Sequence, residues 1–305
     1  IVRRKDNGDM FTIGNVLKPK GYDVRYIYGG NAFFDNMGKY FGGNGYQVLD
    51  KRDIPENLVN HTTAWGVDDE ASFNFTLQQC DKSYNEGNLF FNHIMTVSNH
   101  RPFTYPNGKI DIPGDAKSRE GGVKYTDFAM REFFNLAKKQ PWFNNTVFVI
   151  IADHCASSAG KTELPVDKYR IPAMIYSPGF IQPTHFNTLM SQIDIMPTVF
   201  GLLNFNYQSK FYGQDVLKSD YKPRALIATY QNLGLIKDNV LTIISPKQEV
   251  KQLKLSLIPN PKVASEFQLF YDQKPIATPR KDLENETISY YQTASEMLKN
   301  KKYQK

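Results

Sequence analysis

The sequence places a carboxylate and an imidazole side by side, directly after its most apolar run. Asp153 and His154 follow residues 146–152, a continuous run of aromatic and mostly β-branched residues that ends in Ala152. Carboxylate oxygen and imidazole nitrogen, held at the end of a rigid strand, suit a divalent cation such as Zn²⁺ or Mn²⁺. An Asp-His pair is a weak motif by itself. The alternative is a surface loop in which the Asp caps a turn.

A second segment combines an imidazole with a guanidinium. His100 and Arg101 lie in Ser98–Phe103, again just after an apolar run, residues 89–97. Arg offers a fork of donors to a phosphate or sulfate oxygen, and His can donate a hydrogen bond or shuttle a proton. This segment therefore predicts an anion-binding loop. The alternative is a histidine that is hydrogen-bonded within a turn.

The third candidate is a glycine pair at the end of a predicted strand. Tyr28 is followed by Gly29 and Gly30, which permit a close backbone approach, and then by the polar side chains of Asn31 and Asn36. An anion could bind at the N-terminus of the next helix. We predict Asn31 and Asn36 as substrate-binding residues, with a plain turn as the alternative.

Helical periodicity alternates with short apolar runs along the first two thirds of the chain, which predicts βα units and a parallel sheet. The run 146–152 reads as a central strand buried on both faces of that sheet. Beyond residue 205 the pattern changes to short antiparallel strands followed by a closing helix. The predicted elements are helices at 11–20, 34–41, 68–84, 122–139, 194–203 and 282–302, and strands at 23–28, 47–49, 89–97, 146–152, 173–176, 225–230, 234–237, 240–244, 251–257 and 267–271.

Composition excludes several classes of protein. With 305 residues, 41% of them hydrophobic and 22% charged, the chain can bury a core, and it is neither disordered nor fibrous. The net charge of +6 comes from lysines and arginines spread along the chain. No basic stretch interleaves with aromatics, so we expect no nucleic-acid partner. An anionic substrate or membrane surface fits this charge as well as a solvated surface does.

Seven segments, in the same order along residues 10–215, together resemble the sulfatase-like domain of the lipoteichoic acid synthase and phosphoglycerol transferase family, in the alkaline phosphatase superfamily. Each segment alone is unspecific, whereas the combination is specific. They are Tyr28-Gly-Gly-Asn with Phe34-Asp-Asn-Met37, Trp65-Gly-Val-Asp-Asp-Glu70, Ser98-Asn-His-Arg-Pro-Phe103, Lys124-Tyr-Thr-Asp127, Ala152-Asp-His154, Lys168-Tyr-Arg-Ile-Pro172 and Ile193-Asp-Ile-Met-Pro-Thr198.

The resemblance implies an α/β fold, with a mostly parallel sheet flanked by helices and a smaller C-terminal antiparallel β plus helix subdomain. We expect a sulfatase-like catalytic domain over residues 1–205, N-terminally incomplete, and the C-terminal subdomain over 206–305. The implied enzyme transfers glycerol phosphate, or cleaves a related phosphodiester, through a covalent threonine intermediate. Its substrate would be an anionic phospholipid or glycan of the cell envelope.

The resemblance also implies site residues and a location. Asp153 and His154 match the family's metal ligands for one divalent ion, Mn²⁺ first with Mg²⁺ or Zn²⁺ as alternatives, and His100 matches its substrate-binding histidine. Arg101 is our addition, from its chemistry and its adjacency. The parent protein would be anchored by N-terminal helices in the cell inner membrane, with this domain facing the periplasm.

The chain departs from the family pattern in two ways. The family's nucleophilic threonine and its metal-binding glutamate precede the region where this sequence begins, so we expect the isolated chain to be inactive. Near Phe34 and Asn36, the Gram-positive synthases carry a Trp and an Arg that contact glycerol phosphate. Since the guanidinium contact is missing here, the sequence is closer to Gram-negative members.

Two rival functions stay open: a sulfuric ester hydrolase, and a catalytically degenerate binding or sensing module. Neither Cys80 nor Cys155 lies in the C-x-P-x-R setting of sulfatases, and we expect Cys155 to be a structural thiol. Several other candidates favour structural roles: Asp194 as a helix cap over a metal ligand, Tyr125 and Asp127 as helix residues, and Trp65 as a core residue over an aromatic edge at the rim of the site.

Overall fold

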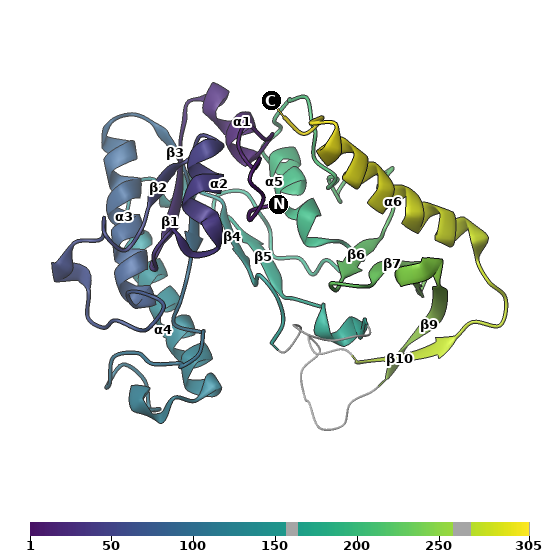
Figure 1. Cartoon of the computed structure of the whole chain (residues 1–305). Helices are drawn as coiled ribbons and strands as arrows, with labels where there is room; N and C mark the ends of the chain where they lie inside the picture. The colour runs from purple at the N-terminus through teal and green to yellow at the C-terminus, as the bar shows by residue number, and fades with distance from the viewer. Residues whose placement is uncertain (157–163, 259–269, 305) are drawn as a thin grey trace. The chain divides into compact units, whose positions relative to one another are not determined.

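The computed structural model describes residues 1–156, 164–258 and 270–304 (Figure 1). These residues form two compact units, Ile1–Thr146 with Gln304, and Val147–Tyr303. Among the described residues the first unit contains one sheet and the second contains two, and each unit is described by itself below. The domain boundary expected at residue 205 stays a prediction.

The first unit contains a parallel sheet with strand order β2-β1-β3. Tyr28 at the end of β1 pairs with Met95 at the end of β3, so the carboxyl ends of these two strands share one edge of the sheet. The residues after them, including Gly29 and His100, start at this edge. The strands are β1 (Tyr22–Tyr28), β2 (Gln47–Leu49) and β3 (Leu89–Met95), and the helices are α1 (Ile13–Leu17), α2 (Met37–Gly43), α3 (Asp69–Asn85) and α4 (Arg119–Ala137).

Capping side chains explain where the two long helices of this unit begin. The Asp68 carboxylate accepts a hydrogen bond from the N–H of Ala71, which starts α3 where the sequence predicts it. Ser118 accepts from the N–H of Gly121, so α4 begins three residues before the apolar periodicity predicts. The helix predicted at 34–41 is divided into a 3₁₀ turn and α2 at Asp35 and Asn36, which have positive φ angles of 49° and 64°.

In the second unit, the structure corrects the expectation for residues 146–152. Strand β4 (Phe148–Ile151) pairs antiparallel with β5 (Ala173–Tyr176) in a sheet that comprises only these two strands among the described residues. All four residues of β4 are half-buried. A continuous apolar run indicates a buried strand but carries no information about its direction or its neighbours, which is why the expectation failed.

The C-terminal part is an antiparallel sheet with strand order β10-β9-β8-β7-β6. Helix α6 (Lys281–Lys299) contacts β7 and β8, as the predicted meander and closing helix require. Of the strand predicted at 267–271, residues 267–269 lie outside the described residues. The remaining elements are α5 (Ile195–Leu202), β6 (Ala225–Ala228), β7 (Leu233–Lys237), β8 (Val240–Ile244), β9 (Val250–Ile258) and β10 (Phe270–Pro275).

The core of this sheet is aliphatic, and the fold class expected from the sequence is confirmed. Leu164 and Leu241 are fully buried in a cluster that also contains Ile227, Ile243 and Leu253. A parallel sheet with helices and a separate antiparallel sheet with a helix make up the mixed α/β architecture that was predicted.

Short 3₁₀ helices complete the described chain. They lie at Lys18–Lys20, Phe34–Asn36, Glu56–Leu58, Gly114–Ala116, Phe143–Asn145, Val166–Lys168, Gln192–Asp194 and Pro246–Gln248.

Candidate functional site

The loop after β3 presents His100 and Arg101 to solvent. Its turn is closed by two backbone hydrogen bonds, from the His100 N–H to the Val97 carbonyl at 3.1 Å and from the Phe103 N–H to the His100 carbonyl at 2.8 Å. Val97 and Ser98 at the base of the loop are buried, whereas both chemistry-bearing side chains are exposed. A fixed backbone that carries exposed polar side chains suits recognition of an anion.

Trp65 lies against this loop and corrects the expectation that it is a core residue. Its ring centroid is 3.9 Å from that of His100, with a tilt of 49° between the planes. Its indole N–H donates to the Arg101 carbonyl at 2.5 Å, and Phe34 meets it edge-on at 5.2 Å. Trp65 is half-buried, so it forms the aromatic rim of the loop.

The glycine pair after β1 serves backbone packing. A Cβ on Gly30 would lie 2.4 Å from the Trp65 carbonyl oxygen, and Gly66 has a φ of 152°. Two backbone segments therefore touch here, and only glycine allows this approach. This contact brings the turn that follows β1 to the same place as Trp65 and His100.

The two asparagines of this turn make local hydrogen bonds. The Asn31 side-chain oxygen accepts from the N–H of Phe33 at 3.0 Å, which forms an Asx turn, and the rest of this side chain is exposed. The Asn36 side-chain nitrogen donates to the Val2 carbonyl at 3.0 Å. Their assignment as substrate-binding residues stays a prediction, and Asn36 would have to exchange this partner.

The structure reveals a cation that the sequence analysis missed. The Arg52 guanidinium lies 5.5 Å from the ring centroid of Phe33, a side chain that is 80% exposed. Asp50 holds it through two hydrogen bonds, from Nε at 2.9 Å and from Nη2 at 3.0 Å. The same carboxylate accepts from the N–H of Ala32 at 3.0 Å, so it ties Arg52 to the turn after β1. The available sequence signal was the cluster Lys51-Arg52-Asp53 directly after β2.

Burial opposes ionisation of the Asp50 carboxyl, but its pKa is still lowered from the usual value. The Arg52 guanidinium and the N–H groups of Arg52 and Ala32 stabilise the carboxylate. Arg52 itself is 63% exposed, so this charge is both fixed and accessible.

Asp153 and His154 lie together after β4 in the second unit. Their side chains are 72% and 67% exposed, and the His154 Nε2 atom is 3.4 Å from an Asp153 carboxylate oxygen. The His154 Nδ1 atom lies 2.9 Å from the Cys155 carbonyl, which favours a proton on Nδ1 and leaves Nε2 as an acceptor. The Gln192 amide donates to the Ala152 carbonyl at 3.1 Å and fixes the end of the strand.

This donor set fits a divalent cation as two of its ligands, because a carboxylate oxygen and an imidazole nitrogen lie on adjacent, exposed side chains. Over residues 1–156, 164–258 and 270–304, no group of three or more His, Cys, Asp or Glu side chains could hold a metal ion. A metal ion at Asp153 and His154 would therefore need further ligands beyond the described His, Cys, Asp and Glu side chains. The metal assignment stays a prediction.

The structural alternatives hold for several other candidates. The Tyr125 hydroxyl is buried and donates to Asp68 and Glu70 at 3.1 Å and 3.0 Å. The Cys155 thiol donates to the Arg170 carbonyl at 2.7 Å, and burial raises its pKa, as expected for a structural thiol.

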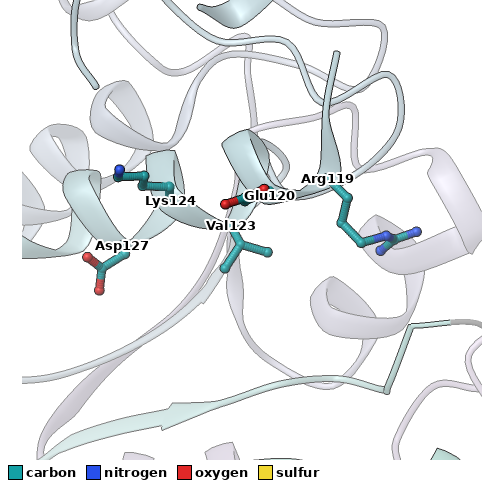
Figure 2. A pocket seen from close by; sticks show the side chains of 5 residues that line it. All are labelled: Arg119, Glu120, Val123, Lys124 and Asp127. Atoms are coloured by element: carbon teal, nitrogen blue, oxygen red, sulfur yellow. The ribbon is translucent and has the colours of Figure 1, made fainter. Parts of the chain in front are cut away.

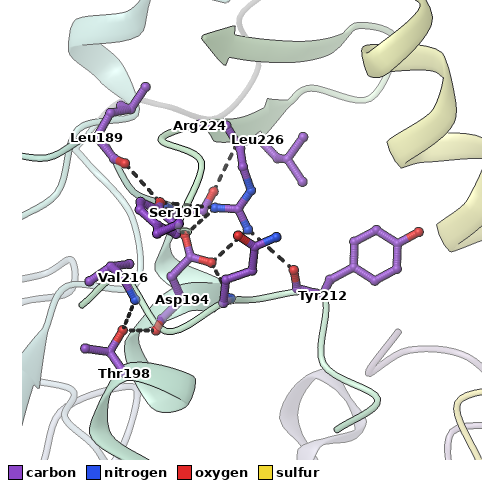
Figure 3. A network of polar contacts seen from close by, with 10 residues as sticks. Leu189, Ser191, Asp194, Thr198, Tyr212, Val216, Arg224 and Leu226 are labelled. Atoms are coloured by element: carbon purple, nitrogen blue, oxygen red, sulfur yellow. Dashed lines mark hydrogen bonds and ion pairs between the residues drawn. The ribbon is translucent and has the colours of Figure 1, made fainter. Parts of the chain in front are cut away.

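Asp194 is also structural. Its carboxylate binds the buried Arg224 guanidinium with two contacts of 2.6 Å and 2.8 Å, and it accepts from the Ser191 N–H at 2.8 Å (Figure 3). A carboxylate with these partners has no free position for a metal.

One large hollow carries no assigned chemistry. It measures about 590 Å³ and lies along one side of α4, lined by Arg119, Glu120, Val123, Lys124 and Asp127 (Figure 2). Its charges alternate in sign, and none of its lining residues is a predicted site residue. We therefore assign no function to it.

The sequence profile of the sulfatase family matches residues 5–205. Phosphoglycerol transferase I from Xanthomonas campestris pv. campestris (strain B100) is 23% identical, over 73% of this chain and 33% of that protein. The lipoteichoic acid synthase from Staphylococcus saprophyticus is 26% identical, over 66% of this chain and 34% of that protein. The chain thus spans about a third of the length of these relatives.

Solved structures are similar to the chain as well. A protein of the alkaline phosphatase superfamily from Vibrio parahaemolyticus has a TM-score of 0.89 and 30% identity, covering 100% of this chain and 72% of its own. The lipoteichoic acid synthase LtaP from Listeria monocytogenes has a TM-score of 0.61 and 23% identity, covering 80% of this chain and 68% of its own.

Proposed function

The chain belongs to the sulfatase family, and from this premise we propose that it is part of a metal-dependent phosphoglycerol transferase or phosphodiesterase. Its substrate would be a glycerol-phosphate lipid or glycan of the cell envelope. The names of the relatives, phosphoglycerol transferase I and lipoteichoic acid synthase, support this substrate class. The observation that carries the proposal is the exposed His100–Arg101 loop, fixed at the carboxyl end of a parallel strand and rimmed by Trp65.

In this proposal, His100 and Arg101 bind the phosphoryl oxygens of the substrate. The guanidinium offers paired N–H donors, and the imidazole offers a further donor. The part of the site that holds the glycerol, or the substrate group next to it, would be lined by Asn31, Asn36 and Arg52. The Gram-positive synthases carry an arginine near Phe34 and Asn36 that this sequence lacks. Arg52 would supply a guanidinium in that region instead.

Asp153 and His154 would hold the metal ion, Mn²⁺ first and Mg²⁺ or Zn²⁺ as alternatives. A bound divalent ion lowers the pKa of a hydroxyl nucleophile and stabilises negative charge on phosphoryl oxygens. The nucleophile would be a threonine outside this sequence. Its oxygen would lose its proton and bond to phosphorus, while the P–O ester bond to the lipid breaks and the lipid takes up a proton and leaves as an alcohol. An acceptor hydroxyl or water would then lose its proton and bond to the same phosphorus, and the threonine would leave with its hydroxyl restored.

We further propose that the parent protein is anchored in the inner membrane, with this domain facing the periplasm. From that side the domain would reach the envelope lipids or glycans that are proposed as its substrates. Among the helices of the described residues, none combines the length and the apolar character needed to cross the bilayer.

The proposal is tested with the natural protein that contains these residues. We expect Mn²⁺-dependent release of labelled glycerol phosphate from phosphatidylglycerol vesicles. Asp153→Asn and His154→Ala should lower turnover at least 100-fold and abolish Mn²⁺ binding in calorimetry, and His100→Ala should mainly raise KM. Asp220→Asn, an exposed carboxylate in the same unit as Asp153, is the matched control and should change neither.

Two other outcomes would contradict the proposal. Hydrolysis of an aryl sulfate without release of glycerol phosphate would indicate a sulfuric ester hydrolase. A protein that binds no metal and turns over neither substrate would indicate a degenerate binding module.

A further inference from the structure

Asp69 is a fully buried carboxylate at the start of α3, and its hydrogen bonds go to another element. One carboxylate oxygen accepts from the N–H of Val97 at 2.9 Å and from the N–H of Ser98 at 3.0 Å. The other oxygen accepts from the Thr126 hydroxyl of α4 at 2.9 Å. One side chain therefore joins α3 and α4 to the end of β3.

The contact between Asp69 and Ser98 is reciprocal. The Asp69 N–H donates to the Ser98 hydroxyl at 3.1 Å. The His100 N–H in turn donates to the carbonyl of Val97, one of the two residues whose N–H groups Asp69 binds. Only Asn99 thus lies between the carboxylate's anchor at Ser98 and the exposed imidazole of His100, and the turn that carries them has defined hydrogen bonds.

Helix capping does not explain this carboxylate. Asp68 already accepts from the N–H of Ala71 at the N-terminus of α3. Burying a second acid beside it costs free energy, because burial raises the pKa of the Asp69 carboxyl against the opposing effect of its hydrogen-bond donors. The hydrogen bonds that the carboxylate accepts from Val97, Ser98 and Thr126 offset this cost, and two of these three donors lie at the base of the His100 loop.

We propose that Asp69 is the positioning residue of His100: by accepting both N–H groups at the end of β3, it holds the imidazole against Trp65 and toward the substrate. This inference rests on the proposed function, since His100 is a substrate-binding residue only there. Asp69 is too deeply buried to touch substrate itself.

The contact between Trp65 and His100 provides a readout that needs no activity. The centroid of the His100 ring lies 3.9 Å from that of the Trp65 ring, so the imidazole shields part of the indole from small molecules in solution. The chain has two tryptophans, so Trp142→Phe leaves Trp65 as the sole indole fluorophore. In that background, acrylamide should quench the emission of His100→Ala more strongly than that of the parent.

In the same background, Asp69→Ala should show at least half of this increase in acrylamide quenching. Asp69→Asn keeps an oxygen that can accept both N–H groups and should be quenched like the parent. Thr126→Val is the matched control. It removes the hydrogen bond from the Thr126 hydroxyl to Asp69 but leaves the two from the N–H groups of Val97 and Ser98. If Asp69→Ala fails to fold by circular dichroism, Asp69→Ser replaces it, because its short hydroxyl cannot accept both N–H groups.

Kinetics on the natural protein separate this inference from the proposed function. Asp69→Ala should raise KM for the phosphodiester about as much as His100→Ala does, by roughly 10-fold or more, while Asp69→Asn should stay near wild type. A folded Asp69→Ala with the acrylamide quenching and the KM of its parent protein overturns the inference. If the wild-type protein shows no turnover but the variants give the expected fluorescence pattern, the proposed function is overturned. The role of Asp69 in substrate positioning then falls with it, and only its role in fixing the loop geometry is left.

Discussion

The turn after β1 shows how one buried acid organises exposed chemistry. The Asp50 carboxylate is 1% exposed, and it holds both the Arg52 guanidinium and the N–H of Ala32. Arg52 then lies over Phe33, which leaves an aromatic ring and a fixed positive charge at the surface. This geometry makes the acid, rather than the exposed arginine, the residue on which the turn depends.

We therefore expect Asp50→Asn to lower the free energy of unfolding by about 1–2 kcal/mol at pH 7. The pKa of Asp50 is lowered in the folded protein, so its ionised form stabilises the fold above the pKa of the unfolded chain, near 4. That contribution is lost as the pH falls through the folded pKa. The difference between wild type and variant, measured by urea unfolding, should shrink below about pH 4.

The control for this prediction is Asp220→Asn, which should leave the free energy of unfolding within about 0.5 kcal/mol of wild type. A difference between Asp50→Asn and wild type that grows as the pH falls would contradict the assigned role.

Cys80 illustrates the opposite effect of burial. It lies in α3, where the Asn92 amide donates to its sulfur at 3.2 Å, and burial raises its pKa to about 12. At pH 8 the thiol therefore stays protonated, whereas the thiolate is the reactive form. In a Cys155→Ser variant we expect no alkylation by iodoacetamide in the native state, and complete alkylation in denaturant, both followed by mass spectrometry. Native-state alkylation at the rate of a free cysteine would show that Cys80 is accessible.

At the scale of elements, the hairpin between β7 and β8 depends on two residues in the left-handed region. Asp238 and Asn239 have φ angles of 51° and 58°, as a type I′ turn requires. The Asp-Asn pair tolerates this conformation, and glycine at the second position tolerates it better. The turn sets the register in which Lys237 pairs with Val240.

Replacing Asn239 tests this turn in both directions. Asn239→Gly should raise the free energy of unfolding by about 0.5 kcal/mol, because the backbone strain at this position is removed. Asn239→Ala should lower it by about 1 kcal/mol. Thermal unfolding of both variants measures these two changes in stability. Equal stability of the two variants would contradict the assigned turn type.

This hairpin, like most elements, could be predicted from the sequence because its signals are local. A turn pair between apolar strands, or Asp68 before an apolar period, indicates an element without knowledge of its neighbours. The direction of β4 depends on β5, whose register is set by distant pairing, and it was wrongly expected. The candidate site follows the same rule: His100 and Asp153 were predicted from strand ends, whereas the contacts of Arg52 and Asp69 with residues distant in the sequence have no local signal.

At the scale of the whole molecule, a buried ion pair in the second unit joins segments 30 residues apart. Asp194 and Arg224 are both fully buried, and the Ser191 N–H also donates to the Asp194 carboxylate (Figure 3). The Gln214 N–H and the Tyr221 hydroxyl donate to the same carboxylate. Burial opposes the charge of the guanidinium, but Asp194 raises the pKa of Arg224 above its usual value. From the sequence, Arg224 follows a Lys-Pro pair and resembles an ordinary surface cation. Only the fold shows that the start of α5 and strand β6 are held together by this contact.

Removing one partner of this ion pair should lower the free energy of unfolding more than removing both partners. Asp194→Leu or Arg224→Met leaves an unpaired charge in the interior, and each should lower the free energy of unfolding by about 3–5 kcal/mol. The double variant has no unpaired charge, so we expect it to recover part of that loss, with the hydrogen bonds of Ser191 and Gln214 still missing. Urea unfolding of the four proteins completes the double-mutant cycle. Additive losses would show that the two side chains do not stabilise one another, whereas a double variant more stable than either single variant is the result that the buried geometry predicts.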